Sequence, residues 1–403
     1  MIRYLANKNN KLNLSIFGRA FKSALKAYLF IVLLATIVFL IMGLNFPSIK
    51  PPDSTELFTP YKSIDSQTRL SRLLADPWYR WDTVHYIEIA EGGYASNVKN
   101  TVWPPLYPAL IRLFSVIFEN SLHSALIISN IASIIAFFLL YLLVYDYQDE
   151  GTARKTLLYL SFFPTAFFLV AAYTESLFLS ISLGIFYALK KEKWWIVAVL
   201  APLAVMTRFQ AVVLAIPILW YAITNLKQNY RHPVWFIKVL LPLVLMVVAF
   251  AGFSIFVHEG LKANWPWITL AEGWNQHVGL PWQGIAANFI WLFSHENEIY
   301  GVVLAKFFDL FCILLAIGVL IWRWKNIPVD QLLFAIFNIL LILVKVDENN
   351  LLVSASRYIL AIFPVFIALA ISNKKFLERI WFGFSILSQV ILVTYFYLWG
   401  WVA

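Results

Sequence analysis

One polar segment, residues 76–94, holds the side chains whose types and spacing could do chemistry. Asp82 directly follows Trp81 at the expected start of a helix over residues 83–90, where free backbone N–H groups and the helix dipole favour an ionised carboxylate. A carboxylate in that place could accept the proton of an attacking hydroxyl group. It could equally do no more than cap the helix, and the local sequence leaves both roles open.

His85 and Glu88 follow Asp82 three and six residues later, so the three side chains can share one face of the helix. Together with Asp76 they could ligate a divalent cation, or they could form hydrogen bonds at a polar surface. Their spacing is looser than that of dedicated metal motifs, so we predict neither a metal site nor a required cofactor. The two successive glycines within residues 91–94 indicate the end of the helix.

The elements that must position this segment are strongly apolar. Of the 403 residues, 61% are hydrophobic and 13% are charged, against about 25% charged residues in soluble domains. Apolar runs of about 20 residues recur, and each could cross about 30 Å of hydrocarbon as a helix. The lone Cys312 lies in such a run, so a disulfide framework and a cysteine metal site are both excluded. We predict an all-α, multi-pass membrane protein with a single domain over residues 1–403.

The apolar runs predict about eleven membrane crossings. They cover residues 27–45, 122–145, 156–172, 175–189, 194–206, 210–224, 239–257, 299–322, 329–345, 356–372 and 380–401. Within residues 1–26, apolar side chains alternate with basic ones at helical spacing, which predicts an amphipathic helix on the inner leaflet before a retained first span. Residues 47–121 and 258–298 form the two large polar loops.

The basic residues set the orientation in the membrane. The side that holds the N-terminus carries 19 of the 31 lysines and arginines but six of the 22 acidic residues, so the positive-inside rule makes it cytoplasmic. The C-terminus and both large loops are then outside. The formal charge of +9 therefore reflects topology, and no nucleic-acid partner is predicted. Short linkers and the lack of retention or lipidation signals favour a prokaryotic plasma membrane over an endoplasmic reticulum.

This topology brings five polar clusters, far apart in sequence, to the outer face. They are residues 76–91, 173–175, 207–208, 258–298 and 345–357. Ionisable groups beside membrane spans usually face a cavity or a partner, because exposing them to hydrocarbon is costly. A shared site is therefore expected on that face.

Arg208 and Arg357 each stand at the outer end of a predicted span, beside small hydroxyl side chains. Their guanidinium groups could hold a phosphate bidentately, or could merely extend to the interface. Glu175 could pair with one of these arginines or meet an acceptor molecule. In the second outer loop, Trp274 and His277 belong to a group of rings that could stack on a sugar or form an ordinary interfacial belt.

Longer motifs carry a resemblance to a known family. The stretch RWDTVHYIEIAEGGY at residues 80–94, followed by WPPLYP at 103–108, resembles the first outer loop of the PIG-V-like mannosyltransferases. FPTAFFLVAAYTESLF at residues 163–178 is similar to the family's proline, aromatic run and Tyr-(Ser/Thr)-Glu-Ser signature. Weaker similarities lie at residues 207–208 and 356–366, and the matches keep the family's order along most of the chain.

The resemblance implies a GT-C-type helical bundle, with short interfacial helices in the outer loops, that transfers mannose from a polyprenyl-phosphate donor on the outer face. It implies that Asp82 is the catalytic general base of an inverting transferase. Candidate donor-binding residues are Arg80, Trp81, His85, Tyr173, Glu175, Arg208 and Arg357, and candidate acceptor-side residues are Asp76, Glu88, Trp274 and His277. A glycan, a lipid or a protein could be the acceptor.

Two other functions stay open on the sequence. A transporter or flippase of lipid-linked sugars also needs charged and aromatic groups, but such proteins place them near mid-membrane and often contain repeats, and no internal repeat is visible here. A noncatalytic subunit of a glycosyltransferase complex could carry the same motifs. Transfer by the purified chain alone would separate an enzyme from both.

Overall fold

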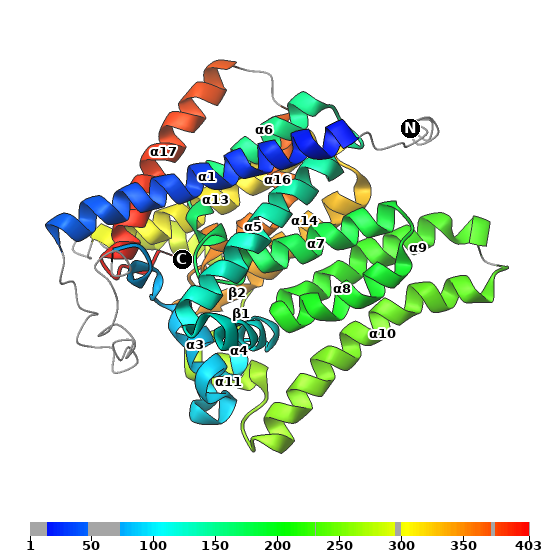
Figure 1. Ribbon diagram of the computed structural model, residues 1–403, viewed down its shortest axis with the longest axis horizontal. Helices are drawn as coiled ribbons and strands as arrows, with labels where there is room; N and C mark the ends of the chain where they lie inside the picture. The colour runs from blue at the N-terminus through cyan, green and yellow to red at the C-terminus, as the bar shows by residue number, and fades with distance from the viewer. Residues whose placement is uncertain (1–13, 47–72, 230, 295–299, 372–374, 403) are drawn as a thin grey trace.

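The computed structural model describes residues 14–46, 73–229, 231–294, 300–371 and 375–402, and most of them are helical (Figure 1). The prediction of an all-α fold is confirmed. Residues 1–13 of the expected inner-leaflet helix, residues 47–72 of the first outer loop and residues 295–299 of the second lie outside the described part.

The bundle is built from helices of 12 to 32 residues. They are α1 (Leu14–Asn45), α5 (Ser121–Tyr145), α6 (Glu150–Ser161), α7 (Glu175–Lys190), α8 (Trp194–Thr207), α9 (Ala215–Asn229), α10 (Pro233–Ile255), α13 (Tyr300–Arg323, continued by η9, Trp324–Asn326), α14 (Val329–Val344) and α17 (Lys375–Tyr397). Helix α5 packs against both α1 and α7, and α17 also packs against α1. The long α1 runs across the bundle and contacts helices from the middle and from the end of the chain (Figure 1).

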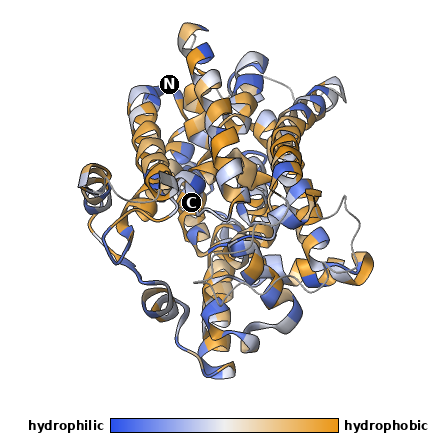
Figure 2. Ribbon diagram, turned by 90° about the vertical axis from the view of Figure 1, so that its left-hand side faces the viewer, coloured by the Kyte–Doolittle hydropathy of each residue, from blue (hydrophilic) through white to orange (hydrophobic). Residues whose placement is uncertain are grey.

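Six of the described helical segments are long and apolar enough to cross a membrane, which supports a multi-pass membrane protein. They are Ser15–Asn45, Ser121–Tyr145, Phe209–Asn229, Pro233–Gly260, Gly301–Asn326 and Glu378–Tyr397, with shorter apolar helices at Leu106–Phe118, Trp194–Thr207 and Val329–Val344. Apolar residues dominate these helices in Figure 2. The predicted number of eleven crossings is not confirmed. The first span and the end of the expected amphipathic helix form one unbroken helix, α1.

Two of the predicted crossings, residues 156–172 and 356–372, are interrupted because each contains a proline that cannot continue a helix. Helix α6 ends before Pro164 and a short turn, η6 (Ala166–Leu169), follows. The second segment consists of α15 (Ala355–Tyr358), η10 (Ile359–Ala361) and α16 (Phe363–Ala370), with Pro364 in the first turn of α16. The Thr165 hydroxyl donates to the Ser356 carbonyl at 2.8 Å, so the two interruptions lie side by side.

Shorter elements lie between the long helices or extend them. They are η3 (Asp76–Trp78), α3 (Asp82–Gly92), η4 (Tyr94–Ser96), η5 (Val98–Val102), α4 (Leu106–Phe118), η7 (Phe209–Leu214), η8 (Phe256–Gly260), α11 (Pro266–Trp274), α12 (Gln283–Ser294), β1 (Gln276–Val278) and β2 (Lys345–Asp347). The predicted helix over residues 83–90 is confirmed as α3, and the residue after its end is Gly93, whose φ of 72° suits glycine. Strand β1 pairs antiparallel with β2, with His277 opposite Val346, and ties the second outer loop to residues 345–357.

Serine side chains at the interface of α5 and α7 fix the start of α7. The Ser129 hydroxyl donates to the Tyr173 carbonyl at 2.9 Å, and the Ser176 hydroxyl donates to the Ser129 carbonyl at 2.9 Å. Small hydroxyl residues let neighbouring helices approach closely and bond across the interface. The turn that carries Tyr173 and Glu175 is therefore held firmly against α5.

Candidate active site

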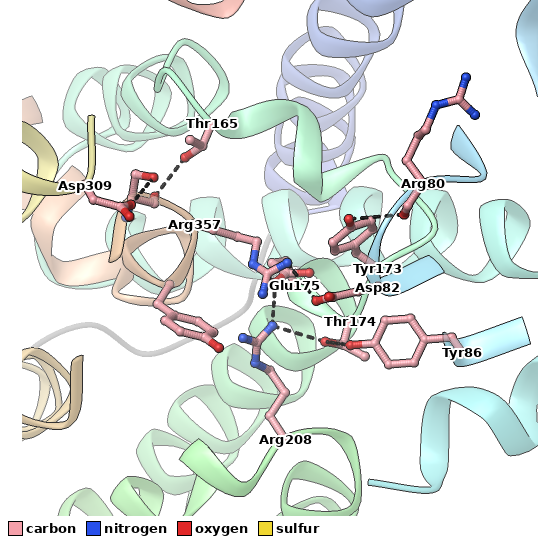
Figure 3. A network of polar contacts seen from close by, with 12 residues as sticks. Arg80, Asp82, Tyr86, Thr165, Tyr173, Thr174, Glu175, Arg208, Asp309 and Arg357 are labelled. Atoms are coloured by element: carbon pink, nitrogen blue, oxygen red, sulfur yellow. Dashed lines mark hydrogen bonds and ion pairs between the residues drawn. The ribbon is translucent and has the colours of Figure 1, made fainter. Parts of the chain in front are cut away.

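Asp82 and Arg357 form a buried ion pair at the centre of the site. Arg357 Nη1 donates to Asp82 Oδ2 at 2.7 Å, although the two residues are 275 positions apart (Figure 3). The side chains are only 12% and 5% exposed. Asp82 is the first residue of α3, but its side chain does not cap the helix. Of the roles that the local sequence left open, the structure therefore does not show helix capping by Asp82, whose side chain pairs with Arg357.

Glu175 joins a second arginine to this pair. Its Oε1 accepts a hydrogen bond from Arg208 Nη1 at 2.5 Å and lies 3.3 Å from Arg357 Nε. The Glu175 side chain is 2% exposed, so the charge is almost fully removed from solvent. Asp82, Arg357, Glu175 and Arg208 thus alternate in sign along one chain of contacts (Figure 3). Such pairing is what allows charges to be buried.

Two residues with positive φ precede the helices that carry Asp82 and Arg357. Trp81, just before α3, has a φ of 52°, and Ser354, just before α15, has a φ of 55°. Both are uncommon for residues with a side chain and cost about 1–3 kcal/mol each, which the surrounding packing must offset. They turn the chain at the start of the two short helices that carry Asp82 and Arg357.

A buried carboxylate in α13 anchors the helix of Arg357. Asp309 Oδ1 accepts hydrogen bonds from the backbone N–H and the hydroxyl of Ser356, at 2.8 and 2.7 Å. Sequence analysis did not single out Asp309. The sequence could have pointed to Asp309, because a carboxylate inside an apolar membrane helix is costly unless it has a fixed partner.

We expect Asp309→Leu to destabilise the protein by about 1–3 kcal/mol, because both Ser356 donors lose a buried acceptor. Asp309→Asn keeps an acceptor oxygen and should cost less. Ser356→Ala, which removes one of the two donors, should also fall between the wild type and Asp309→Leu. Thermal unfolding in detergent or nanodiscs measures the order, and an Asp309→Leu variant as stable as the wild type would contradict this anchoring.

Tyrosine and threonine side chains line one flank of the charged cluster. The Thr174 hydroxyl lies 3.1 Å from Arg208 Nη1 and 3.2 Å from the Tyr86 hydroxyl. The Tyr173 hydroxyl donates to the Arg80 carbonyl at 3.3 Å, and its ring lies 5.3 Å from the Arg357 guanidinium. Tyr173, Glu175, Arg208 and Arg357, all predicted to line the site, are therefore brought together around Asp82.

Arg80 and Trp81 have side chains that leave this cluster. The Arg80 guanidinium donates to the carbonyls of Asp76 and Tyr79 and stacks 4.0 Å above the ring of Trp399, away from Asp82 (Figure 3). Burial lowers the pKa of Arg80 to about 10, so it stays charged at neutral pH. Trp81 Nε1 donates to the Gly400 carbonyl at 3.1 Å. Both side chains tie the start of α3 to residues 399–400.

Glu88 and Trp274, predicted on the acceptor side, and His85, predicted to bind the donor, belong to a second cluster beside α3. His85 Nδ1 bonds to Asn100 Oδ1 at 3.0 Å, and Asn100 Nδ2 donates to Glu88 Oε2 at 3.0 Å. The His85 ring stacks on Trp103 with 4.3 Å between centroids, and Trp274 meets it edge-on at 5.2 Å.

Metal ligation by these residues gains no support from the structure. The Asp76 carbonyl bonds to Arg80, and Asp76 lies in η3, outside the His85 cluster. His277 is exposed and bonds to Asn350. Among the described residues, no group of three or more His, Cys, Asp or Glu side chains is arranged to hold a metal ion.

The Glu88 carboxyl should make the free energy of unfolding depend on pH in the acidic range. Partial burial raises its pKa, but the His85 ring 3.8 Å away and the Asn100 amide outweigh burial and hold the pKa below 4.5. A lowered carboxyl pKa stabilises the fold above the unfolded value, and this contribution disappears as the pH falls through the folded pKa. Glu88→Gln should therefore cost under about 1 kcal/mol at pH 7 and nothing in acid.

Unfolding of the wild type and Glu88→Gln from pH 7 downwards measures this dependence. Glu259→Gln is the matched control, because the Glu259 side chain is 64% exposed and should show little difference at any pH. A difference between Glu88→Gln and the wild type that does not change with pH would contradict the expectation.

Comparison with known proteins gives two matches. The profile of the family described as dolichyl-phosphate-mannose-protein mannosyltransferase matches residues 102–270, which include Glu175 and Arg208. GPI mannosyltransferase 2 of Schizosaccharomyces pombe is 26% identical over 287 residues, 69% of this chain and 55% of the relative. Together these matches support a PIG-V-like mannosyltransferase. The chain spans about half the length of that relative, and no solved structure matches it.

The site also contains residues that sequence analysis did not single out. Lys345 Nζ donates to the Tyr358 hydroxyl at 2.9 Å, and the Tyr358 ring also faces the guanidinium groups of Arg208 and Arg357, at 4.8 and 5.4 Å. Burial raises the pKa of Tyr358, but Lys345 and the two arginines outweigh burial and lower it to about 7. The sequence could have pointed to Lys345, because its charge directly follows an apolar run. Thr174, which contacts Arg208, was not named individually either.

Proposed function

We propose that this protein transfers mannose from a polyprenyl-phosphate donor to an acceptor hydroxyl on the outer face of the membrane, with inversion at the anomeric carbon. The observation that carries the proposal is the buried contact of Asp82 with Arg357, extended through Glu175 to Arg208. A carboxylate that can accept a proton stands beside two cations that can hold a phosphate. Those are the two kinds of group that this reaction needs.

The reaction is a single displacement. The acceptor oxygen attacks the anomeric carbon while the bond from that carbon to the donor phosphate oxygen breaks. The hydroxyl proton passes to the Asp82 carboxylate, and the bonding electrons leave with the lipid phosphate. Attack from the face opposite the leaving group inverts the configuration, as in other inverting glycosyl transfers. The proposal uses no metal ion and no organic cofactor.

Arg357 links proton transfer to donor binding. Its guanidinium is bonded to the carboxylate that the proposal names as the base. A donor phosphate beside Arg357 would compete for the same N–H donors, since arginine binds phosphate and carboxylate in the same bidentate manner. Asp82 would then be released to accept the hydroxyl proton when a donor is bound. Glu175 would keep Arg208 and Arg357 in place during this exchange.

The proposal extends to orientation and partners. The N-terminus would be cytoplasmic and the C-terminus outside, in a prokaryotic plasma membrane, with a polyprenyl-phosphate sugar as donor. The acceptor, a glycan, a lipid or a protein, would approach the outer loops. There Glu88 and Trp274 stand around the buried His85 ring in a polar and aromatic cluster beside α3.

Transfer assays on the purified chain in nanodiscs test the proposal. We expect transfer from a mannosyl polyprenyl phosphate to one member of a panel of glycan, lipid and peptide acceptors, and none from a nucleotide sugar. The anomeric configuration of the product, read by NMR, should be inverted. Movement of the lipid-linked sugar across the bilayer without a new glycosidic bond would instead favour a flippase. Transfer only after another subunit is added would favour a noncatalytic role.

A further inference from the structure

The segment that follows α17 folds back against the start of α3. Trp399 has a φ of 62°, a conformation uncommon for a residue with a side chain, and it turns the chain just beyond the helix. The Gly400 N–H donates to the Tyr395 carbonyl at 2.8 Å and closes this turn. We call residues 398–402 the strap. Trp399 is 7% exposed and Val402 is 1% exposed, so the strap is packed into the protein.

Two rings of the strap contact the two residues that precede the proposed base. The Arg80 guanidinium carbon lies 4.0 Å from the centroid of the Trp399 ring, which is the geometry of a cation–π interaction. The Trp401 ring meets the Trp81 ring edge-on, with 5.0 Å between centroids. The Gly400 carbonyl, between the two strap tryptophans, accepts a hydrogen bond from Trp81 Nε1 at 3.1 Å. The strap therefore holds the start of α3 at three points.

The backbone of these two residues forms the first turn of α3. The Thr83 N–H donates to the Arg80 carbonyl at 3.1 Å, and the Val84 N–H donates to the Trp81 carbonyl at 3.0 Å. Trp81 has a φ of 52°, and such a conformation persists only where surrounding contacts hold it. Asp82 is the next residue, so any movement of this turn also moves its carboxylate.

The end of α17 also contacts the surroundings of the arginine in the central ion pair. The Phe396 ring lies 6.4 Å from the Tyr173 ring and 5.9 Å from the Phe168 ring, between centroids. The Arg357 guanidinium carbon lies 5.3 and 5.6 Å from the centroids of the same two rings. One short segment, residues 396–402, therefore supports both sides of the ion pair, although it belongs to neither of the helices that carry it.

We propose that Trp399 is a positioning residue for sugar transfer: through Arg80 it fixes the turn into α3, and thereby the place of the Asp82 carboxylate beside Arg357. The proposal rests on the proposed function, in which Asp82 is the base, and it adds how that base is held. The resemblance implied instead that Arg80 binds the donor. The two roles differ in their kinetics, because loss of positioning lowers kcat, whereas loss of a donor contact raises KM.

Transfer kinetics of the full chain in nanodiscs test this role, with a mannosyl polyprenyl phosphate as donor. Trp399→Leu should lower kcat about 10- to 100-fold, because moving a reacting group by about 1 Å costs that much, and should leave the donor KM within about threefold of the wild type. Trp399→Phe keeps a ring face for the Arg80 guanidinium, so it should restore most of the lost kcat. Wild-type kcat in a folded Trp399→Leu protein would overturn the proposal.

Trp235→Leu is the matched control. Trp235 lies on α10, which packs chiefly against α8, and its exposure of 9% is close to the 7% of Trp399. Both leucine variants therefore lose a buried indole and a similar amount of packing, and thermal unfolding measures that shared loss. Of the two, we expect only Trp399→Leu to lower kcat. An equal loss of kcat in both variants would show a merely structural role and overturn the proposal.

A double-mutant cycle tests whether Trp399 acts through Arg80. Arg80→Met removes the guanidinium that lies on the Trp399 ring and keeps much of the apolar volume. If the two side chains act through this one contact, the kcat of the double variant Arg80→Met with Trp399→Leu should be no lower than that of the more affected single variant. Losses that multiply in the double variant would overturn the proposal. So would an Arg80→Met variant that raises the donor KM at wild-type kcat.

Hydrogen exchange separates the strap from the proposed function, because it needs no donor. The Thr83 and Val84 amides bond to the turn that the strap holds, so loosening that turn should speed their exchange. We expect Trp399→Leu to speed exchange at the start of α3 about 3- to 30-fold, the equivalent of one cation–π contact, and Trp235→Leu to leave it unchanged.

The two proposals can therefore fail separately. Unchanged exchange in Trp399→Leu would overturn the role of the strap and leave the proposed function standing. Faster exchange in Trp399→Leu, with no sugar transfer by the wild type, would overturn the proposed function and support the strap as the contact that holds the start of α3.

Discussion

Replacing Asp82 by asparagine is expected to lower sugar transfer roughly 10²- to 10⁴-fold, the range for losing a positioned general base. The asparagine side chain has nearly the same shape and can still accept a hydrogen bond from Arg357, but it cannot take the proton of the acceptor hydroxyl. Glu175 Oε1 remains 3.3 Å from Arg357 Nε, so the guanidinium keeps one carboxylate. We therefore expect a folded protein with low kcat and a donor KM within a few-fold of the wild type.

Transfer from mannosyl polyprenyl phosphate, with product formation followed over time, measures this loss. Size-exclusion profiles and thermal unfolding establish that the variant is folded. Glu259→Gln makes the same chemical change at an exposed carboxylate outside the charged cluster and should keep wild-type activity. Unchanged turnover in a folded Asp82→Asn protein would remove Asp82 from the mechanism.

Replacing Arg357 by methionine is expected to destabilise the protein by about 3–5 kcal/mol and to abolish transfer. Methionine keeps much of the apolar volume, but Asp82 loses the guanidinium that neutralises it and Glu175 keeps only Arg208. Breaking a buried pair on one side leaves an uncompensated charge, and that accounts for the size of the effect. Thermal and chemical unfolding give the stability, and the transfer assay gives the activity.

A double-mutant cycle isolates the pair. In the Arg357→Met background, Asp82→Asn removes the uncompensated carboxylate and should recover part of the lost stability, although activity should stay absent. Ser388→Ala on α17 is a control of small expected effect, because the described hydrogen bond of the Ser388 hydroxyl stays within its own helix. Additive losses in the double variant would show that Asp82 and Arg357 do not depend on each other.

Many features of this protein were predictable because they depend on short stretches of sequence. The apolar runs predicted an all-α membrane bundle, since each run needs only its own composition to favour hydrocarbon. The helix after Trp81 and its end at Gly93 follow from local patterns and from the backbone freedom of glycine. The order of the motifs pointed to the family that the comparisons support. Their residue types marked Asp82, Glu175, Arg208 and Arg357 as unusual in an apolar chain.

The partners of those residues were decided by the tertiary structure. Asp82 could equally have capped its own helix, and its bond to Arg357, 275 residues away, depends on where Trp81 and Ser354 turn the chain. Arg80, only two residues before Asp82, faces Trp399 because the chain reverses between them. The segments around Pro164 and Pro364 were predicted to be full crossings but are interrupted. Apolar composition indicates that a segment favours hydrocarbon, and it does not indicate that the helix is continuous. Only the folded structure shows that Lys345 belongs to the site, because it lies against the same Tyr358 ring as Arg208 and Arg357. Sequence therefore determined which groups are present and which segments favour hydrocarbon, whereas packing between distant segments determined which charges meet.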